Sequence, residues 1–427
     1  MATRGKGEGS IYKDETTGLW TASIELPPLR GKRRRKVIRR KNKRDVVTEL
    51  TRLRGELEKR GDLPTASMTV EQWFDYWLRT IVTPHLAPNT TANYRNVTVK
   101  YIVPTIGKTK LDKVAPASVR RVHEAVRDAG MSGTYALNVH RIMSSAFEAA
   151  LRENHTSRNP ARLVIAPKKT ARELEILDLE EGIRVLGAAA AMPNGARWAT
   201  ALLTGARRGE VIGVQLDRVV DELDLSWQLQ RIIWTHGCGA AKGYDDKGRP
   251  AFPCGSPRGT DCPERRINVP DDYERRHLTG GLYLTRPKSK AGWRIIPLVD
   301  PLRSMLERHV DTEPPNPWGL VFTSHGHPLD PDQDSNNWRD VLRDVGIEKD
   351  VRLHDVRHTT VDLLYAAGVP EDIIMRIIGH SQLAQTRDYR KRLSPSERVR
   401  IRDAMVQFSQ QFMPTRDDPD TPRALEA

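Results

Sequence analysis

The chain has 427 residues, which is enough for two or three domains with buried cores. Its 69 Lys and Arg outnumber its 55 Asp and Glu, and the net charge of +14 predicts a polyanionic partner, nucleic acid before an anionic membrane surface. Three cysteines are too few for a disulfide scaffold, no apolar run is long enough to span a membrane, and the N-terminus has no apolar signal segment. We therefore expect a soluble, cytoplasmic protein.

More than half of the excess charge lies in residues 1–62, which hold 18 Lys and Arg against 9 Asp and Glu. Short strands are expected at 10–13, 20–26 and 32–40, with a turn at Pro27-Pro28 and Gly31, and an amphipathic helix follows. The third strand carries an almost unbroken row of basic side chains: Arg33, Arg34, Arg35, Lys36, Arg39 and Arg40. A sheet packed on a helix and coated in this way predicts a surface that enters a DNA groove; the alternative is a basic tail that screens phosphates.

Residues 66–166 read as a mainly helical domain behind a linker at 63–67. Helices are expected at 70–78, 89–101, 116–129 and 134–153. The aromatic residues Trp73, Phe74 and Trp77 recur at helical spacing, and we interpret them as a core face and not as a ligand site. Asn159-Pro160 and Pro167-Lys168-Lys169 then break the pattern.

Residues 172–413 read as a larger, mixed α+β but mainly helical domain, and 414–427 as a disordered tail. Helices are expected at 177–191, 197–203, 300–311, 334–345, 353–367 and 370–378. Strand-like segments occur at 225–234 and 281–298. The second of these predicts a β-hairpin with Lys288 and Lys290 near its tip.

Several polar residues of this last domain suggest an anion site. His354 and Arg357 are three residues apart, which on a helix places both on one face, where they can grip one anion; the alternative is a surface pair. Gly205 permits a tight turn before Arg207, and Glu210 lies one helical turn further on, where it can hold an arginine in place.

Together with residues downstream, these motifs resemble the catalytic set of the tyrosine recombinases, the phage integrase family. The matching stretches read TGARRGE, PKSKAGWRIIPL, LHDVRHT and IIGHSQLAQTRDY. The residues that carry the resemblance, in chain order, are Arg207, Lys290, His354, Arg357, His380 and Tyr389. Residues 1–62 resemble the arm-site DNA-binding domain of such integrases, 66–166 their helical, SAM-like core-binding domain, and 172–413 their catalytic domain.

The resemblance implies that Tyr389 attacks a DNA phosphodiester and leaves a 3′-phosphotyrosine and a free 5′-hydroxyl. Arg207 and Arg357 would clamp the non-bridging oxygens, because a guanidinium keeps its charge. His354 would donate or assist proton transfer, His380 would donate to a phosphate oxygen, and Lys290 would protonate the leaving oxygen.

Some neighbours have competing interpretations. Lys288 is an alternative to Lys290, while Arg208 and His358 are interpreted as structural neighbours and Glu210 as support. The family chemistry needs no metal or other cofactor. It implies double-stranded DNA with core and arm sites as partner, a homotetramer on that DNA, and an excisionase and a DNA-bending host factor as further candidate partners.

Two rival functions remain at this point. A type IB-like topoisomerase or a resolvase of multimers would use the same chemistry, but an arm domain suggests two classes of DNA site. A non-catalytic DNA-binding regulator could keep the fold, but it would not need all six residues.

Two further features lie outside the catalytic motifs. An insertion at 236–278 holds His236, Cys238, Cys254 and Cys262, a weak zinc candidate because no C-x₂-C pair is present; free thiols are the favoured alternative. The last helix has an apolar face, which we expect to dock on a neighbouring subunit rather than on its own domain. Its members are Ile401, Met405, Phe408 and Phe412.

Overall fold

The computed structural model of the chain describes residues 11–29, 32–60, 68–171, 173–239, 241–243, 245–246, 250–287, 293–379 and 395–413. They form two compact units: the chain up to residue 171, and the chain from residue 172 together with the short segment Leu86–Asn89. Each unit is described by itself. Among the described residues, no helix has both the length and the apolar character needed to cross a bilayer.

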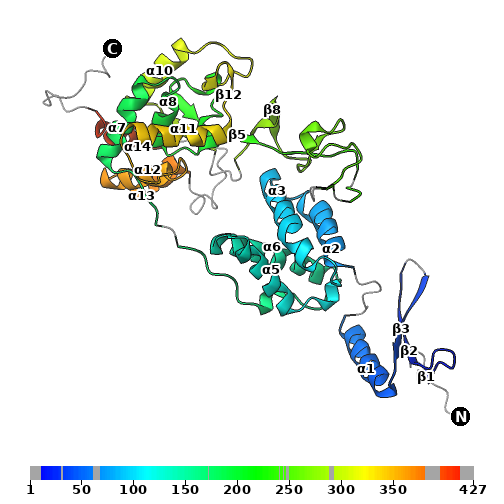
Figure 1. Ribbon diagram of the computed structural model, residues 1–427. Coiled ribbons are helices and arrows are strands. Elements are labelled where there is room, and N and C mark those ends of the chain that lie inside the picture. The colour runs from blue at the N-terminus through cyan, green and yellow to red at the C-terminus, as the bar shows by residue number, and fades with distance from the viewer. Residues whose placement is uncertain are drawn as a thin grey trace. The chain divides into compact units, whose positions relative to one another are not determined.

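A three-stranded antiparallel sheet in the order β1-β2-β3 opens the first unit (Figure 1). Its elements are β1 (Ile11–Lys13), β2 (Trp20–Leu29) and β3 (Lys32–Arg40), followed by helix α1 (Lys43–Arg60). The apolar side chains of one sheet face are buried against α1, as predicted. The expected turn at Pro27-Pro28 is wrong, because β2 continues through both prolines to Leu29. They are tolerated because β1 pairs only with the first residues of β2, so this edge of β2 needs no N–H donors.

The next helices have an aromatic core. They are α2 (Val70–Trp77), α3 (Pro88–Val97), α4 (Val103–Ile106), α5 (Pro116–Asp128) and α6 (Gly133–Arg152), with the π-helical turns η1 (Leu78–Val82) and η2 (Thr98–Ile102) after α2 and α3. Trp73 is fully buried, and its indole N–H donates to the carbonyl of Ala146 on α6 at 3.0 Å. Phe74 meets Phe147 edge to face. The aromatic stripe is therefore a core face, as predicted.

Helices surround one hydrophobic core in the second unit. They are α7 (Leu179–Ala191), α8 (Ala196–Thr204), α9 (Arg208–Val211), α10 (Leu302–Thr312), α11 (Pro331–Asp344), α12 (Val356–Ala366), α13 (Glu371–Ile378) and α14 (Pro395–Gln410). Every residue of α8 is buried, and α7, α10 and α12 pack against it (Figure 1). The central place of α8 fixes the loop that follows it, and this loop carries Arg207.

The strands of the second unit form small antiparallel sheets. They are β4 (Glu222–Asp224), β5 (Gln228–Arg231), β6 (Trp234–Thr235), β7 (Arg266–Ile267), β8 (Arg275–Thr279), β9 (Leu282–Thr285), β10 (Ile295–Pro297), β11 (Thr323–Ser324) and β12 (His327–Pro328). The predicted hairpin between β9 and β10 is wrong, because β9 lies between β5 and β8 whereas β10 pairs with β4. The local hairpin is β8–β9, whose tight turn at Gly280-Gly281 has a positive φ of 51° at Gly280.

The apolar face of α14 is covered within the chain. Ile401, Met405, Phe408 and Phe412 are all buried and belong to the core of the second unit. Our prediction that this face docks on a neighbouring subunit is therefore wrong, because the face packs on its own unit. The spacing alone could not distinguish the two cases, because any apolar face predicts burial but not the partner that buries it.

Candidate active site and DNA-binding surfaces

The turn after α8 places Arg207 at the edge of the core. Gly205 ends α8 in the left-handed conformation, with φ of 59°. A Cβ atom there would lie 2.4 Å from Cδ1 of Ile378, so the turn requires glycine for its conformation and for its close approach to α13. Arg207 follows as the N-cap of α9, and its side chain stays 38% exposed.

Glu210 is the fully buried anchor of the site. Its carboxylate accepts from the backbone N–H of Arg207 at 2.9 Å and from Nη1 of Arg207 at 2.7 Å. It also accepts from Nη2 of Arg294 at 3.0 Å. Burial raises the pKa of Glu210, but Arg294 and Arg207 outweigh this effect and hold it below its ordinary value. Glu210 is therefore a charged carboxylate that holds two arginines in place.

Arg294 is a buried bridge that the sequence analysis did not single out. It lies directly before β10, and its Nε donates to the carbonyl of Ile377 at 2.7 Å. Together with its bond to Glu210, this contact ties the last turn of α13 to the α8–α9 loop. A signal was present in the sequence, because a charged residue that begins an apolar strand needs a buried partner.

Arg357 lies inside the site, 5% exposed, in the first turn of α12. Its Nη1 donates to the carbonyl of Gly205 at 2.8 Å, and its Nη2 donates to the carbonyl of Ile378. Among the described residues no other group accepts a hydrogen bond from this side chain, so two of its five N–H groups are engaged there. Backbone carbonyls thus orient the guanidinium without neutralising its charge.

His354 is exposed and precedes α12, since the helix begins at Val356. We expected both His354 and Arg357 to lie on the helix. This is correct for Arg357 but wrong for His354, which lies in the tight turn at 353–355 that precedes the helix. Desolvation lowers the pKa of His354; Asp355 opposes this, while His358, Arg207 and Arg357 lower it further. The imidazole is therefore neutral at neutral pH and can accept a proton as well as donate one. His358 lies beside it, with the ring centroids 6.3 Å apart.

The charges of this cluster do not cancel. Glu210 forms ion pairs with Arg207 and Arg294, and Arg357 lies nearby, so these four groups together carry a net charge of +2. Burial lowers the pKa of Arg357, and the nearby charges of Arg207 and Arg294 lower it further. An anion bound between Arg207 and Arg357 would relieve this repulsion, so the geometry describes an anion site.

The structure thus brings together Arg207, Glu210, His354 and Arg357, and it adds Arg294. The predicted residues Lys290, His380 and Tyr389, and the alternative Lys288, lie outside the described residues. Arg208 is half-buried and donates to Ser335, as a structural neighbour would.

Comparisons with known proteins agree with the motifs. Residues 267–394 match the phage integrase family, and residues 69–125 match the N-terminal SAM-like domain of phage integrases. An integrase of Saccharopolyspora erythraea is 29% identical over 385 residues, which is 84% of this chain and 87% of that protein. An integrase of Streptomyces ambofaciens is 27% identical over 92% of this chain and 94% of its own length. The chain belongs to the phage integrase family. It is a tyrosine recombinase, an enzyme that cuts and rejoins DNA at specific sites.

Solved structures support the fold of this recombinase. The integrase of transposon Tn1549, solved with a circular intermediate DNA, matches with a TM-score of 0.56 at 17% identity, over 78% of this chain and 97% of that one. A lambda integrase tetramer bound to a Holliday junction matches with a TM-score of 0.50 at 15% identity, over 91% and 97%. The predicted multidomain recombinase fold is confirmed.

In the N-terminal sheet of the recombinase, the six basic residues of β3 divide between two faces. Lys36 and Arg34 pair with the buried Ile24 and Leu26 of β2, so they share the sheet face that packs on α1. Arg35 and Arg39 pair with Glu25 and Thr21 and lie on the opposite, open face. By the same alternation Arg40 joins the first group and Arg33, which forms an ion pair with Glu25, joins the second. Only Arg33, Arg35 and Arg39 are placed to face a ligand across the open face.

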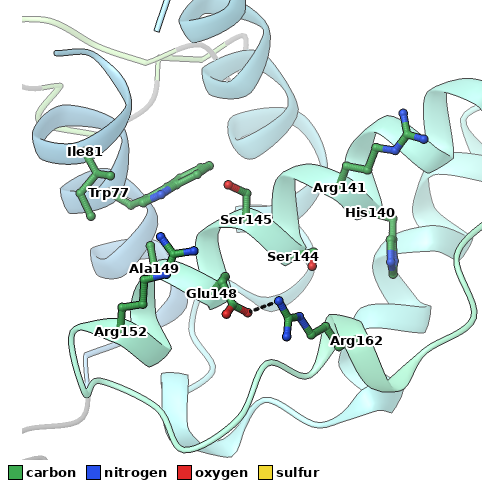
Figure 2. Close-up of a pocket in the computed structure, with 10 residues that line it drawn as sticks. All are labelled: Trp77, Ile81, His140, Arg141, Ser144, Ser145, Glu148, Ala149, Arg152 and Arg162. Carbon is green, nitrogen blue, oxygen red and sulfur yellow. Dashed lines mark ion pairs between the residues drawn. The ribbon is translucent and has the colours of Figure 1, made fainter. Parts of the chain in front are cut away.

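A second basic surface lies in the helical part of the first unit. A groove of about 460 Å³ is lined by residues of α2, η1 and α6 and by Arg162 (Figure 2). Arg141, Arg152 and Arg162 contribute three positive charges to it, and Glu148 alone contributes a negative one, 3.2 Å from Arg162. The excess of arginine fits a phosphate backbone better than a neutral ligand.

Proposed function

We propose that this recombinase integrates and excises a mobile DNA element, and that Arg207, His354 and Arg357 bind the phosphate at which the strand is cut. One observation carries the proposal. A net charge of +2 is fixed at the edge of the core by a buried carboxylate and by backbone carbonyls.

The chemistry follows from this arrangement. In the transition state the phosphorus has five oxygens and more negative charge on the non-bridging ones than in the substrate. Donors that are already oriented lower the energy of this state without rearranging. Arg357 is held by the carbonyls of Gly205 and Ile378, and Arg207 by Glu210, so neither has to move when the charge develops.

Tyr389, Lys290 and His380 complete the proposed mechanism. The phenol oxygen of Tyr389 bonds to phosphorus as the P–O5′ bond breaks, and the 5′-oxygen receives a proton from Lys290. The phenol proton passes to neutral His354 or to solvent, and His380 donates to a phosphate oxygen. A phenol has an ordinary pKa of about 10, so the surrounding positive charge favours the attacking phenolate.

The phosphotyrosyl bond keeps the free energy of the phosphodiester. Attack by a 5′-hydroxyl of another strand reverses the first step and completes an exchange, and tyrosine recombinases need no cofactor for this catalysis. We propose a homotetramer on two DNA sites as the acting assembly, in the cytoplasm, with an excisionase and a DNA-bending host factor as candidate partners.

Recombination between two DNA fragments tests this function. The junctions of the integrated element give the attachment-site sequences, and two duplexes carrying them are mixed with the full-length protein in EDTA without ATP. We expect products of recombinant length, because transesterification supplies its own energy. A regulator that only binds DNA would shift both duplexes in a gel and give no recombinant, with or without host extract, and this result would contradict the proposal.

The open face of the N-terminal sheet is proposed to bind the arm site. The basic residues of β3 are divided equally between the two faces of the sheet, so variants of one face can be compared with variants of the other. Changing Arg33, Arg35 and Arg39 to alanine is expected to remove three phosphate contacts with element-end DNA. The slope of log K against log salt concentration should therefore become less steep by about 2.7. Changing Arg34, Lys36 and Arg40 removes the same charge from the other face, and a much smaller change is expected. Equal slopes for the two variants in a fluorescence-anisotropy titration would show that the face does not matter.

A further inference from the structure

The insertion of the catalytic domain is short of hydrophobic core. Among its described residues between 236 and 277, only Cys262 and Pro270 are buried. The two-stranded ribbon β6–β7 has just two paired residues on each strand. So small a ribbon without a core is held in most proteins by a disulfide or a metal ion.

The four metal-binding side chains of the insertion lie together at the end of this ribbon. His236 and Cys238 directly follow β6, and Cys262 precedes β7 by four residues, while Cys254 comes from the loop between them. The ligand atoms of His236, Cys238, Cys254 and Cys262 all lie within 4.8 Å of one another. All three cysteines are free thiols.

The distances suit one tetrahedral ion. Nδ1 of His236 lies 3.3 Å from Sγ of Cys254 and 4.0 Å from Sγ of Cys238. Zinc–sulfur bonds of about 2.3 Å and zinc–nitrogen bonds of about 2.05 Å place ligand atoms about 3.6 to 3.8 Å apart in a tetrahedron. Only small adjustments would bring the four ligands to this spacing.

The surroundings of the cluster support a metal rather than chance proximity. A Cβ atom at Gly237 would lie 1.9 Å from the carbonyl oxygen of Glu264, so the two ligand-bearing loops approach as closely as backbones can. The ring of His236 stacks on Phe252 at 3.6 Å, which fixes the direction of Nδ1.

We propose that His236, Cys238, Cys254 and Cys262 bind one structural zinc ion that closes the β6–β7 ribbon. Three sulfurs and one imidazole nitrogen form a closed set with no position for a water, the arrangement of structural zinc. The family match begins at residue 267, so all four ligands lie outside it. The site belongs to the insertion and not to the chemistry of strand cleavage.

The ion would act on the catalytic domain through Trp234. The indole N–H of Trp234 donates to the carbonyl of Gly280 at 3.2 Å, in the turn between β8 and β9. The same ring lies 6.3 Å from the ring of Tyr283 on β9, and the guanidinium of Arg265 lies over it at 5.1 Å. A fixed ribbon would therefore support β9, the strand that leads toward Lys290.

Metal analysis of the full-length protein tests the proposal directly. Protein purified under reducing conditions without a histidine tag is expected to contain about one zinc per chain by plasma mass spectrometry. Cys238→Ser with Cys262→Ser should remove the zinc. His277→Gln should keep it, because His277 lies in the same insertion but its Nε2 meets the Gly280 carbonyl and not the cluster. His236→Cys should also keep the metal, since a thiolate can replace the imidazole, while His236→Ala should lose it.

Cobalt gives a second readout that does not require the variants to fold well. Wild-type protein stripped of zinc and loaded with Co²⁺ is expected to show the visible absorption of a tetrahedral thiolate site. Wild-type protein that holds no zinc and takes up neither ion would overturn the proposal, and so would a disulfide found between two of the three cysteines in freshly purified protein. Neither measurement involves DNA, so failure here leaves the recombinase function untouched.

Discussion

Replacing Tyr389 by phenylalanine is expected to abolish the covalent complex between this protein and its DNA. Phenylalanine keeps the ring but lacks the oxygen that bonds to phosphorus, so no phosphotyrosyl bond can form. A suicide substrate with a nick near the cleavage site traps the wild-type complex, because the short fragment that carries the 5′-hydroxyl diffuses away. The measurement is the fraction of labelled DNA that migrates with protein on a denaturing gel.

Tyr365→Phe is the matched control. Tyr365 lies near the end of α12, is 50% exposed, and is not among the residues proposed to touch the phosphate. We expect adduct formation equal to that of wild type for this variant, and none for Tyr389→Phe at equal DNA occupancy. An adduct formed by the Tyr389→Phe variant would mean that another residue is the nucleophile, and no adduct from any of the three proteins would contradict the catalytic proposal.

Those parts of the proposed phosphate site that depend on residues close together in the sequence could be predicted from the sequence. Arg207 and Glu210 are three residues apart, and a single turn of α9 brings them together, so spacing was sufficient. Arg357 was found through its motif. Its hydrogen bonds reach Gly205, 152 positions away, and Ile378, and no local pattern could have indicated these carbonyls.

What the sequence analysis missed depends on distant partners. Apolar alternation identified β9 and β10, but it carries no information about pairing, and the partner of β10 is β4, far earlier in the chain. Arg294 was overlooked for the same reason, since its carboxylate partner is 84 positions away. The cysteine spacings fit no compact motif, so the sequence left both free thiols and a weak zinc site open. The proximity of the three sulfurs could not be predicted, because it depends on the return of the chain at β7.

Arg357→Lys is the second change with a large expected effect, because it preserves the positive charge but removes the planar guanidinium and its oriented N–H donors. A guanidinium can donate to the carbonyls of Gly205 and Ile378 and still present N–H groups to a phosphate, whereas an ammonium has three donors on one atom. We expect the rate of strand cleavage to fall roughly a hundredfold to a thousandfold, the usual loss when one oriented donor is removed from a transition state. Single-turnover cleavage of the nicked substrate at saturating protein measures this rate.

Arg352→Lys controls for the substitution itself, since Arg352 is exposed in the same segment and its backbone N–H, not its side chain, bonds to Asp355. Its cleavage rate should match wild type. Thermal unfolding separates a local effect from a general one, because a lysine that merely destabilised the core would lower the melting temperature and weaken DNA binding together with cleavage. If Arg357→Lys folds, binds DNA and cleaves at the wild-type rate, then positive charge alone suffices at this position, and the orientation supplied by the carbonyls of Gly205 and Ile378 is not what accelerates the reaction.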